Sequence, residues 1–116
     1  MRDRLRSQQC ATALKALAEP DRLRIVQCLL EGPRSVSEVA EALAEPLANV
    51  SHHLAVLRKA RLVRARKQGK FVVYSLHPGV FRPAEPGGAP DRLDLGCCRL
   101  ELTGADRPLA DRSKGG

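Results

Sequence analysis

Apolar positions in about the first 60 residues of the chain recur at the three-to-four-residue spacing of amphipathic helices. One such set predicts a first helix, and it comprises Cys10, Ala13, Leu14 and Leu17. The next set predicts a second helix, and it comprises Leu23, Val26, Leu29 and Leu30. Pro20 and Gly32 are expected to bound this second helix, because proline is tolerated at the first helical position and glycine commonly ends a helix.

Two further short helices are predicted to form a helix-turn-helix. Ser35 and Glu38 have the spacing of a capping box, which starts a third helix through Val39, Ala40 and Leu43. Pro46 starts the fourth helix, over residues 47–60. Only a few residues around Glu45 separate the two helices, and that spacing is typical of DNA-reading helix pairs.

After Val63 the apolar period changes from helical to alternating, which predicts a two-stranded hairpin with its turn at Gln68-Gly69. Val72, Tyr74 and Leu76 lie on one face of the return strand. A hairpin directly behind a helix-turn-helix is a wing. The predicted fold is therefore mainly α with a small β-wing, a winged helix-turn-helix.

The pattern weakens after His77. Residues 82–90 contain three prolines and two glycines, which predicts a linker. A short alternating segment follows and predicts one strand around Gly96. We expect a DNA-binding and dimerisation domain over residues 1–80, and a Pro/Gly-rich linker and tail over residues 81–116.

The net charge of +7 is confined to the part of the chain that is predicted to be folded. Residues 1–76 carry 14 basic and 7 acidic side chains, whereas residues 77–116 carry 6 of each. This distribution favours double-stranded nucleic acid as the partner. No apolar run approaches membrane-spanning length, and the basic N-terminus lacks the apolar core of a secretion signal. A cytoplasmic protein with four free thiols is expected.

The fourth helix is predicted to enter the major groove, with Asn49, Ser51 and His52 nearest the bases. The wing tip at Gln68-Gly69 is expected at the minor groove. Six cations are expected on phosphates, namely Arg58, Lys59, Arg64, Arg66, Lys67 and Lys70. His52 and His53 are poor candidates for a zinc pair, because neighbouring positions on a helix point about 100° apart. No carboxylate near Ser51 in sequence would orient a catalytic histidine, so we do not expect an enzyme.

Three segments of the chain resemble the ArsR/SmtB family of winged-helix repressors. They are LAEPDRLRIVQCLLEG, SEVAEAL and NVSHHLAVLRKARLVRARKQGKFVVYSL, and the resemblance runs roughly over residues 11–76, a little more than half of the chain. The resemblance implies a homodimer that sits on an operator beside genes for metal or metalloid resistance. It also implies release from DNA when an inducer ion binds, with no permanent cofactor.

The resemblance also provides inducer sites to compare. One family site uses cysteines on the helix before the reading helix, where this chain has Ser35, Ser37 and Ala40. Another uses histidines and carboxylates on a C-terminal dimer helix, but this chain has no histidine after His77. The remaining candidate is the pair Cys97-Cys98, which resembles members that sense trivalent arsenicals through C-terminal cysteines.

Trivalent arsenic and antimony are soft and bind two or three thiolates. Gly96 permits a backbone excursion that turns both Cys97 and Cys98 toward one ion, although the pair could instead simply pack. A third thiolate would come from Cys10, if the tail folds back on the first helix, or from Cys28, whose position favours a core role. A two-sulfur site favours methylarsenite, and a three-sulfur site accepts arsenite or antimonite.

Two other functions are consistent with the sequence. The first is a repressor of the same fold that senses oxidants, with Cys97 and Cys98 joined to each other or to Cys10 in a disulfide. The second is a winged-helix module whose basic surface meets an acidic protein.

Overall fold

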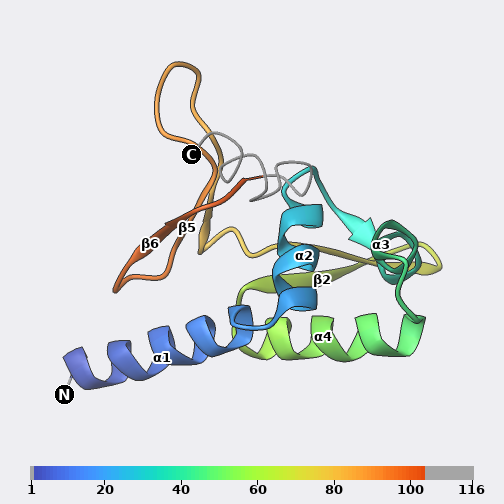
Figure 1. Ribbon diagram of the computed structural model, residues 1–116, viewed down its shortest axis with the longest axis horizontal. Helices are drawn as coiled ribbons and strands as arrows, with labels where there is room; N and C mark the ends of the chain where they lie inside the picture. The colour runs from blue at the N-terminus through green and yellow to red at the C-terminus, as the bar shows by residue number, and fades with distance from the viewer. Residues whose placement is uncertain (1, 104–116) are drawn as a thin grey trace, which may run out of the picture.

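The computed structural model describes residues 2–103, with side chains from residue 6 onward, as four helices and two small sheets (Figure 1). The elements in chain order are α1 (Arg2–Leu17), α2 (Pro20–Leu29), β1 (Arg34–Ser35), α3 (Val36–Leu43), α4 (Leu47–Lys59), β2 (Val63–Gln68), β3 (Phe71–Leu76), β4 (Phe81–Arg82), β5 (Arg92–Asp94) and β6 (Arg99–Glu101). Within the described range no helix is both long and apolar enough to cross a membrane. The predicted winged helix-turn-helix is confirmed.

The starts of α2 and α3 follow from local capping. The Glu19 side chain accepts a hydrogen bond from the Arg22 backbone N–H, 2.9 Å away, and Pro20 occupies the first turn of α2. The predicted capping box is present at α3. There the Ser35 side chain accepts from the Glu38 N–H, and the Glu38 carboxylate accepts from the Ser35 N–H. The hydrogen bond from the Ser35 N–H stabilises the ionised Glu38 carboxylate and is the main cause that lowers the pKa of Glu38. Hydrogen bonding with the Ser35 side chain is the second cause.

The end of α4 is a Schellman motif. The Leu62 N–H donates to the Leu57 carbonyl at 3.0 Å, and the Arg61 N–H donates to the Arg58 carbonyl at 3.0 Å. Leu57 and Leu62 are both fully buried, which supplies the apolar contact that accompanies this motif. The motif places Arg61 in the left-handed region, at φ 61°. The chain therefore leaves the reading helix through a tight turn directly into the wing.

The wing is a three-stranded antiparallel sheet in the order β1-β3-β2. Strands β2 and β3 pair along their whole length, from Val63 opposite Leu76 to Gln68 opposite Phe71. The two-residue turn is Gly69-Lys70, one position later than predicted, and Gly69 adopts φ 61°. The favoured two-residue hairpin turns need a positive φ at their first position, which glycine adopts readily. Gly69 therefore occupies the first position of the turn, and not the second.

The segment after the wing is more ordered than a linker. Strand β5 pairs with both β4 and β6, so residues 81–103 contain a second small sheet. The expectation of a single strand around Gly96 is wrong, because Gly96 lies at φ 90° in the turn between β5 and β6. Leu93 on β5 is fully buried in the same core as the helices, which anchors the sheet to the domain. Residues 104–116 of the predicted tail lie outside the described residues.

The core joins all four helices to both sheets. Ile25, Leu54, Leu62 and Leu93 are among its fully buried side chains. Figure 1 shows α1 and α4 along the base of the molecule, with α2 standing above them and the β5–β6 hairpin on the side of α1. Two members of the predicted helical stripes are instead exposed, Leu14 by 40% and Leu23 by 42%. These side chains lie outside the core of a single protomer.

We expect Leu93→Ala to lower the free energy of unfolding by about 2–5 kcal/mol, because it removes a fully buried side chain at the junction of hairpin and helices. Urea denaturation followed by circular dichroism measures the change. Val72→Ala is the matched control, since Val72 is 42% exposed and its change should stay within about 0.5 kcal/mol. An unchanged midpoint for Leu93→Ala would mean that the hairpin does not pack on the core.

Candidate DNA surface and thiol site

The exposed face of α4 carries the predicted base-reading residues. Asn49, Ser51 and His52 are all exposed, whereas Val50 and Leu54 on the opposite face are buried. Because the apolar residues of α4 recur at helical spacing, they face the core together and leave the polar side chains on the solvent side of the helix. Their chemistry suits hydrogen bonding to base edges.

His53 points away from this face, toward the start of α2. Its Nδ1 lies 3.3 Å from Nη1 of Arg22 and 3.9 Å from the Glu19 carboxylate, and its Nε2 lies 3.9 Å from the Asp21 carboxylate. Glu19, Asp21 and His53 offer ligand atoms within 4.8 Å of one another. The Arg22 guanidinium already occupies this cluster, so the arrangement does not suit a further cation. It joins the middle of α4 to the N-terminus of α2.

The predicted phosphate-binding residues lie on the exposed end of α4 and along the wing. All six are exposed, namely Arg58, Lys59, Arg64, Arg66, Lys67 and Lys70. Because side chains alternate along a strand, Arg64, Arg66 and Gln68 share one face of β2 and Lys67 lies on the other. The face that bears the two arginines is opposite to the one that buries Val63 against the core. Exposed cations thus recur along the chain from the end of α4 to the wing tip.

Arg61 was not among the predicted DNA contacts, although it is an exposed cation in the same basic segment. The signal in the sequence was that Arg61 belongs to the run of basic residues between positions 58 and 70, which contains no acidic residue. It is exposed and stands between Lys59 and Arg64, in a left-handed conformation that ordinarily favours glycine. A long cation at this position therefore carries a conformational cost.

We expect Arg61→Gly to raise the free energy of unfolding by about 0.5–1 kcal/mol, since glycine removes a left-handed penalty of about 1–2 kcal/mol but adds backbone entropy to the unfolded state. Arg58→Gly, inside α4, should instead lower it by about 1 kcal/mol. Urea denaturation of the two variants tests the difference in sign. A loss of stability in both would contradict the assignment of strain to Arg61.

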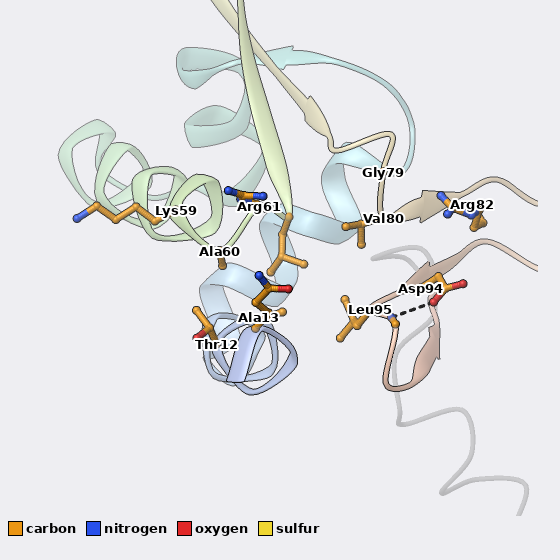
Figure 2. Close-up of a pocket in the computed structure, with 13 residues that line it drawn as sticks. Thr12, Ala13, Lys59, Ala60, Arg61, Gly79, Val80, Arg82, Asp94 and Leu95 are labelled. Carbon is orange, nitrogen blue, oxygen red and sulfur yellow. Dashed lines mark hydrogen bonds between the residues drawn. The ribbon is translucent and has the colours of Figure 1, made fainter. Parts of the chain in front are cut away.

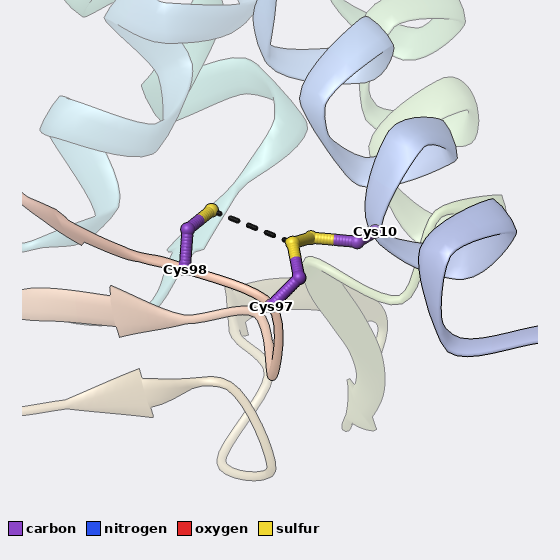
Figure 3. Close-up of side chains that lie close together, drawn as sticks. All are labelled: Cys10, Cys97 and Cys98. Carbon is purple, nitrogen blue, oxygen red and sulfur yellow. Dashed lines mark hydrogen bonds between the residues drawn. A yellow bond between two sulfur atoms is a disulfide. The ribbon is translucent and has the colours of Figure 1, made fainter. Parts of the chain in front are cut away.

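The second candidate site is formed by three cysteines from opposite ends of the described chain (Figure 3). Cys10 lies on α1 and is only 3% exposed, while Cys97 and Cys98 belong to the turn between β5 and β6. Cys10 and Cys97 form a disulfide, and the Cys98 Sγ lies 3.6 Å from the Cys97 Sγ. All three sulfur atoms lie within 4.8 Å of one another. The tail thus folds back onto the first helix beside Cys10.

The expectation of four free thiols is wrong for Cys10 and Cys97. The β5–β6 hairpin brings these residues, 87 positions apart in the sequence, to a Cα separation of 6.2 Å. That separation falls within the range in which a disulfide forms without backbone movement. Cys28, the less favoured third ligand, is buried on α2 and free, and it does not join the cluster.

The turn geometry explains how two neighbouring side chains face the same way. Gly96 adopts φ 90°, its N–H donates to the Asp94 carboxylate at 3.0 Å, and the Leu95 N–H donates to the Cys98 carbonyl at 2.9 Å. Outside a regular strand the two sulfur atoms need not diverge, so Cys97 and Cys98 both point toward α1 (Figure 3). Arg99 is largely exposed, and its Nε lies 3.6 Å from the Asp94 carboxylate.

A groove of about 470 Å³ lies beside this turn (Figure 2). One wall is formed by α1 and by the end of α4, including Lys59 and Arg61. The facing wall contains Leu95 and Gly96, directly before the cysteine pair. The turn that carries the sulfur atoms therefore lies across an open space from the end of the reading helix.

Comparison with known proteins places the fold among transcriptional regulators. The family model described as a helix-turn-helix domain matches residues 17–66. The regulator NmtR of Mycobacterium tuberculosis is 45% identical over 69 residues, which cover 60% of this chain and 58% of NmtR. The homodimeric winged helix-turn-helix domain of Mb0332 from Mycobacterium bovis, described as a possible ArsR-family regulator, superimposes with a TM-score of 0.65 at 33% identity. That match covers 67% of this chain and 72% of the solved Mb0332 chain, which is the fragment 1–100.

The chain belongs to the ArsR/SmtB family of winged-helix transcriptional regulators. Membership confirms the expectation that it is not an enzyme. A family structure described as a possible transcriptional regulator for arsenical resistance is 40% identical, with a TM-score of 0.55, and the match covers 58% of this chain and 70% of that one. The chain spans little more than half the length of NmtR, and the helix-turn-helix match ends at residue 66, well before Cys97.

Proposed function

We propose that this ArsR/SmtB-family chain is a homodimeric repressor that binds operator DNA and leaves it when trivalent arsenic or antimony binds Cys10, Cys97 and Cys98. The observation that carries the proposal is the gathering of three sulfur atoms within 4.8 Å of one another. In the reduced protein these cysteines supply three thiolates, which is the donor set that a soft, pyramidal ion takes.

The number of sulfur atoms favours inorganic inducers. Arsenite and antimonite exchange their oxygens for three thiolates, whereas methylarsenite retains its carbon and takes only two. Cys10 is held on a helix and buried, and Cys97 is exposed on the facing turn, so an ion can approach from solvent and be closed against α1. Cys10 is therefore proposed as the ligand that distinguishes arsenite from methylarsenite.

DNA binding is supported by charge and by relatives. The proposed base-reading residues Asn49, Ser51 and His52 are exposed on α4, and exposed cations follow at the end of this helix and along the wing. The Mb0332 domain is described as homodimeric and DNA-binding.

The groove beside the thiol site supports a route between inducer and DNA. An ion bound to all three sulfur atoms ties the β5–β6 turn to α1, and both form walls of the groove that Lys59 and Arg61 also line. Release of the DNA requires the ion to bind the DNA-free conformation of the protein more tightly than the DNA-bound conformation. Moving the population from 99:1 to 1:99 takes about 5.5 kcal/mol of differential affinity, which thiolate bonds can supply.

The test is a fluorescence anisotropy titration of a labelled operator duplex with the reduced protein. Micromolar arsenite should release the DNA, and methylarsenite should need a higher concentration. Peroxide alone should not mimic arsenite under the same conditions. Continued binding in the presence of excess arsenite would contradict the proposal.

A second candidate function is favoured by the Cys10–Cys97 disulfide itself. The same repressor would then sense peroxides, since two thiols and one peroxide molecule form a disulfide and two waters. Release of DNA by peroxide, reversed by dithiothreitol, together with no response to arsenite would favour this function. Failure of the wild-type protein to bind any duplex at low salt would instead favour a protein-interaction module.

A further inference from the structure

The wing tip carries an exposed aromatic side chain that neither the fold nor the thiol site explains. Phe71 is 66% exposed, the largest exposed fraction among the large apolar residues of the described chain. It stands at the start of β3, directly beside the turn residues Gly69-Lys70. Single exposed apolar side chains are common, so a role for Phe71 has to be argued from the residues that share its face of the wing.

The strand register places Phe71 on the cationic face. It is directly opposite Gln68, and directly opposed residues share a face of an antiparallel pair. Arg66 and Arg64 follow on the same face of β2, at every second position. The neighbouring Val72 is opposite Lys67 and belongs to the other face, the one that buries Leu76. The ring therefore projects on the side that the two arginines present to a polyanion.

We propose that Phe71 is a DNA-contacting residue that packs in the minor groove and gives the wing a preference for A·T base pairs. The proposal rests on the DNA binding proposed above, but not on the identity of the inducer. Phosphate contacts by the wing cations would hold the tip over the groove, and apolar side chains are known to enter the minor groove there. A guanine amino group obstructs the floor of that groove at G·C pairs, whereas A·T pairs lack it.

Charge complementarity selects DNA over a protein partner as the occupant. Arg64 and Arg66 lie on the same face of the wing as the ring, Lys70 directly precedes it in the turn, and the wing strands β2 and β3 contain no acidic residue. A second copy of this chain would bring the same cations together and repel. Binding of a DNA duplex, in contrast, is favoured both by the cations and by the aromatic ring.

The test uses two labelled duplexes that differ only in the base pairs under the wing, one A·T-rich and one G·C-rich, with anisotropy measured between about 50 and 200 mM salt. Phe71→Ala should weaken binding to the A·T-rich duplex about ten-fold and bring its affinity close to that of the G·C-rich duplex. The slope of log affinity against log salt should not change, because no phosphate contact is lost. Phe71→Leu should retain part of the preference.

Two control variants separate this role from others. Lys70→Ala should reduce the salt slope by about 0.9 per bound protomer and weaken both duplexes equally. Val72→Ala, on the other face of the wing, should bind as the wild type does. Circular dichroism confirms that each variant is folded.

Three results would overturn the proposal. If Phe71→Ala binds both duplexes as the wild type does, Phe71 makes no DNA contact that contributes to affinity. That result would leave the proposed repressor function unaffected. A change of oligomeric state in Phe71→Ala, seen by sedimentation velocity, would assign the ring to a protein interface. Absence of duplex binding by the wild type would overturn both this inference and the proposed function, whereas binding without arsenite release would affect only the latter.

Discussion

Replacing Cys97 and Cys98 together by serine should abolish arsenite-induced release of DNA while leaving DNA affinity in the absence of arsenite unchanged. The variant retains one of the three sulfur atoms of the cluster, and serine hydroxyls are poor ligands for soft ions. Full release needs on the order of 10⁴-fold preference for the DNA-free state, which one remaining sulfur atom cannot provide. Anisotropy titration of the reduced variant with arsenite measures the loss.

Single variants divide the site further. Cys10→Ser should lose the arsenite response and keep a response to methylarsenite, because two sulfur atoms remain on the turn. Cys28→Ser is the matched control, since Cys28 is outside the cluster, and it should respond to arsenite normally. Arsenite release that survives in the Cys97→Ser/Cys98→Ser variant would place the inducer site elsewhere.

The parts of the fold that the sequence predicted are those with strong local signals. Ser35 and Glu38 form the predicted capping box because both partners lie within one helical turn. The change of apolar period after Val63 marked the start of the wing to within one residue, since β2 begins at Val63 itself. The turn was placed one position early, because Gly69 satisfies either the first or the second position of a two-residue hairpin and only the pairing of Gln68 with Phe71 decides between them.

The thiol site depended on contacts between distant segments, which local patterns do not specify. The sequence indicated Cys97 and Cys98 by their chemistry, but Cys10 joins them only because Leu93 anchors the hairpin in the core beside α1. The prolines and glycines of residues 82–90 suggested a linker, although this segment contains the loop between two paired strands. A single buried leucine gives little signal in a short, polar stretch.

Exposure of Leu14 and Leu23 has a similar origin. Helical spacing predicts which residues share a stripe but not what covers it. In the described protomer the stripes of α1 and α2 extend past the intramolecular core, so part of each is exposed. The sequence pattern therefore predicted more complete burial of these stripes than the described chain shows.

The strongest physical consequence of the cationic surface is salt dependence. Six exposed cations on the α4 end and wing are proposed to contact phosphates, and each releases counterions when it binds. Raising the salt concentration from about 50 to 200 mM should therefore weaken DNA binding about a thousand-fold if one protomer's six contacts form, and more for a dimer. Anisotropy with an operator duplex across a salt series measures the slope.

Matched arginine variants locate the charges responsible for that slope. Arg66→Ala, on the exposed face of the wing, should lower the slope by about 0.9 per bound protomer. Arg99→Ala removes an arginine whose side chain is 74% exposed but lies on the β5–β6 hairpin, so the slope should not change. Equal effects of the two variants would mean that binding responds to net charge alone. A selective effect of Arg66→Ala would instead show that the wing itself lies on the phosphates, with Phe71 beside it.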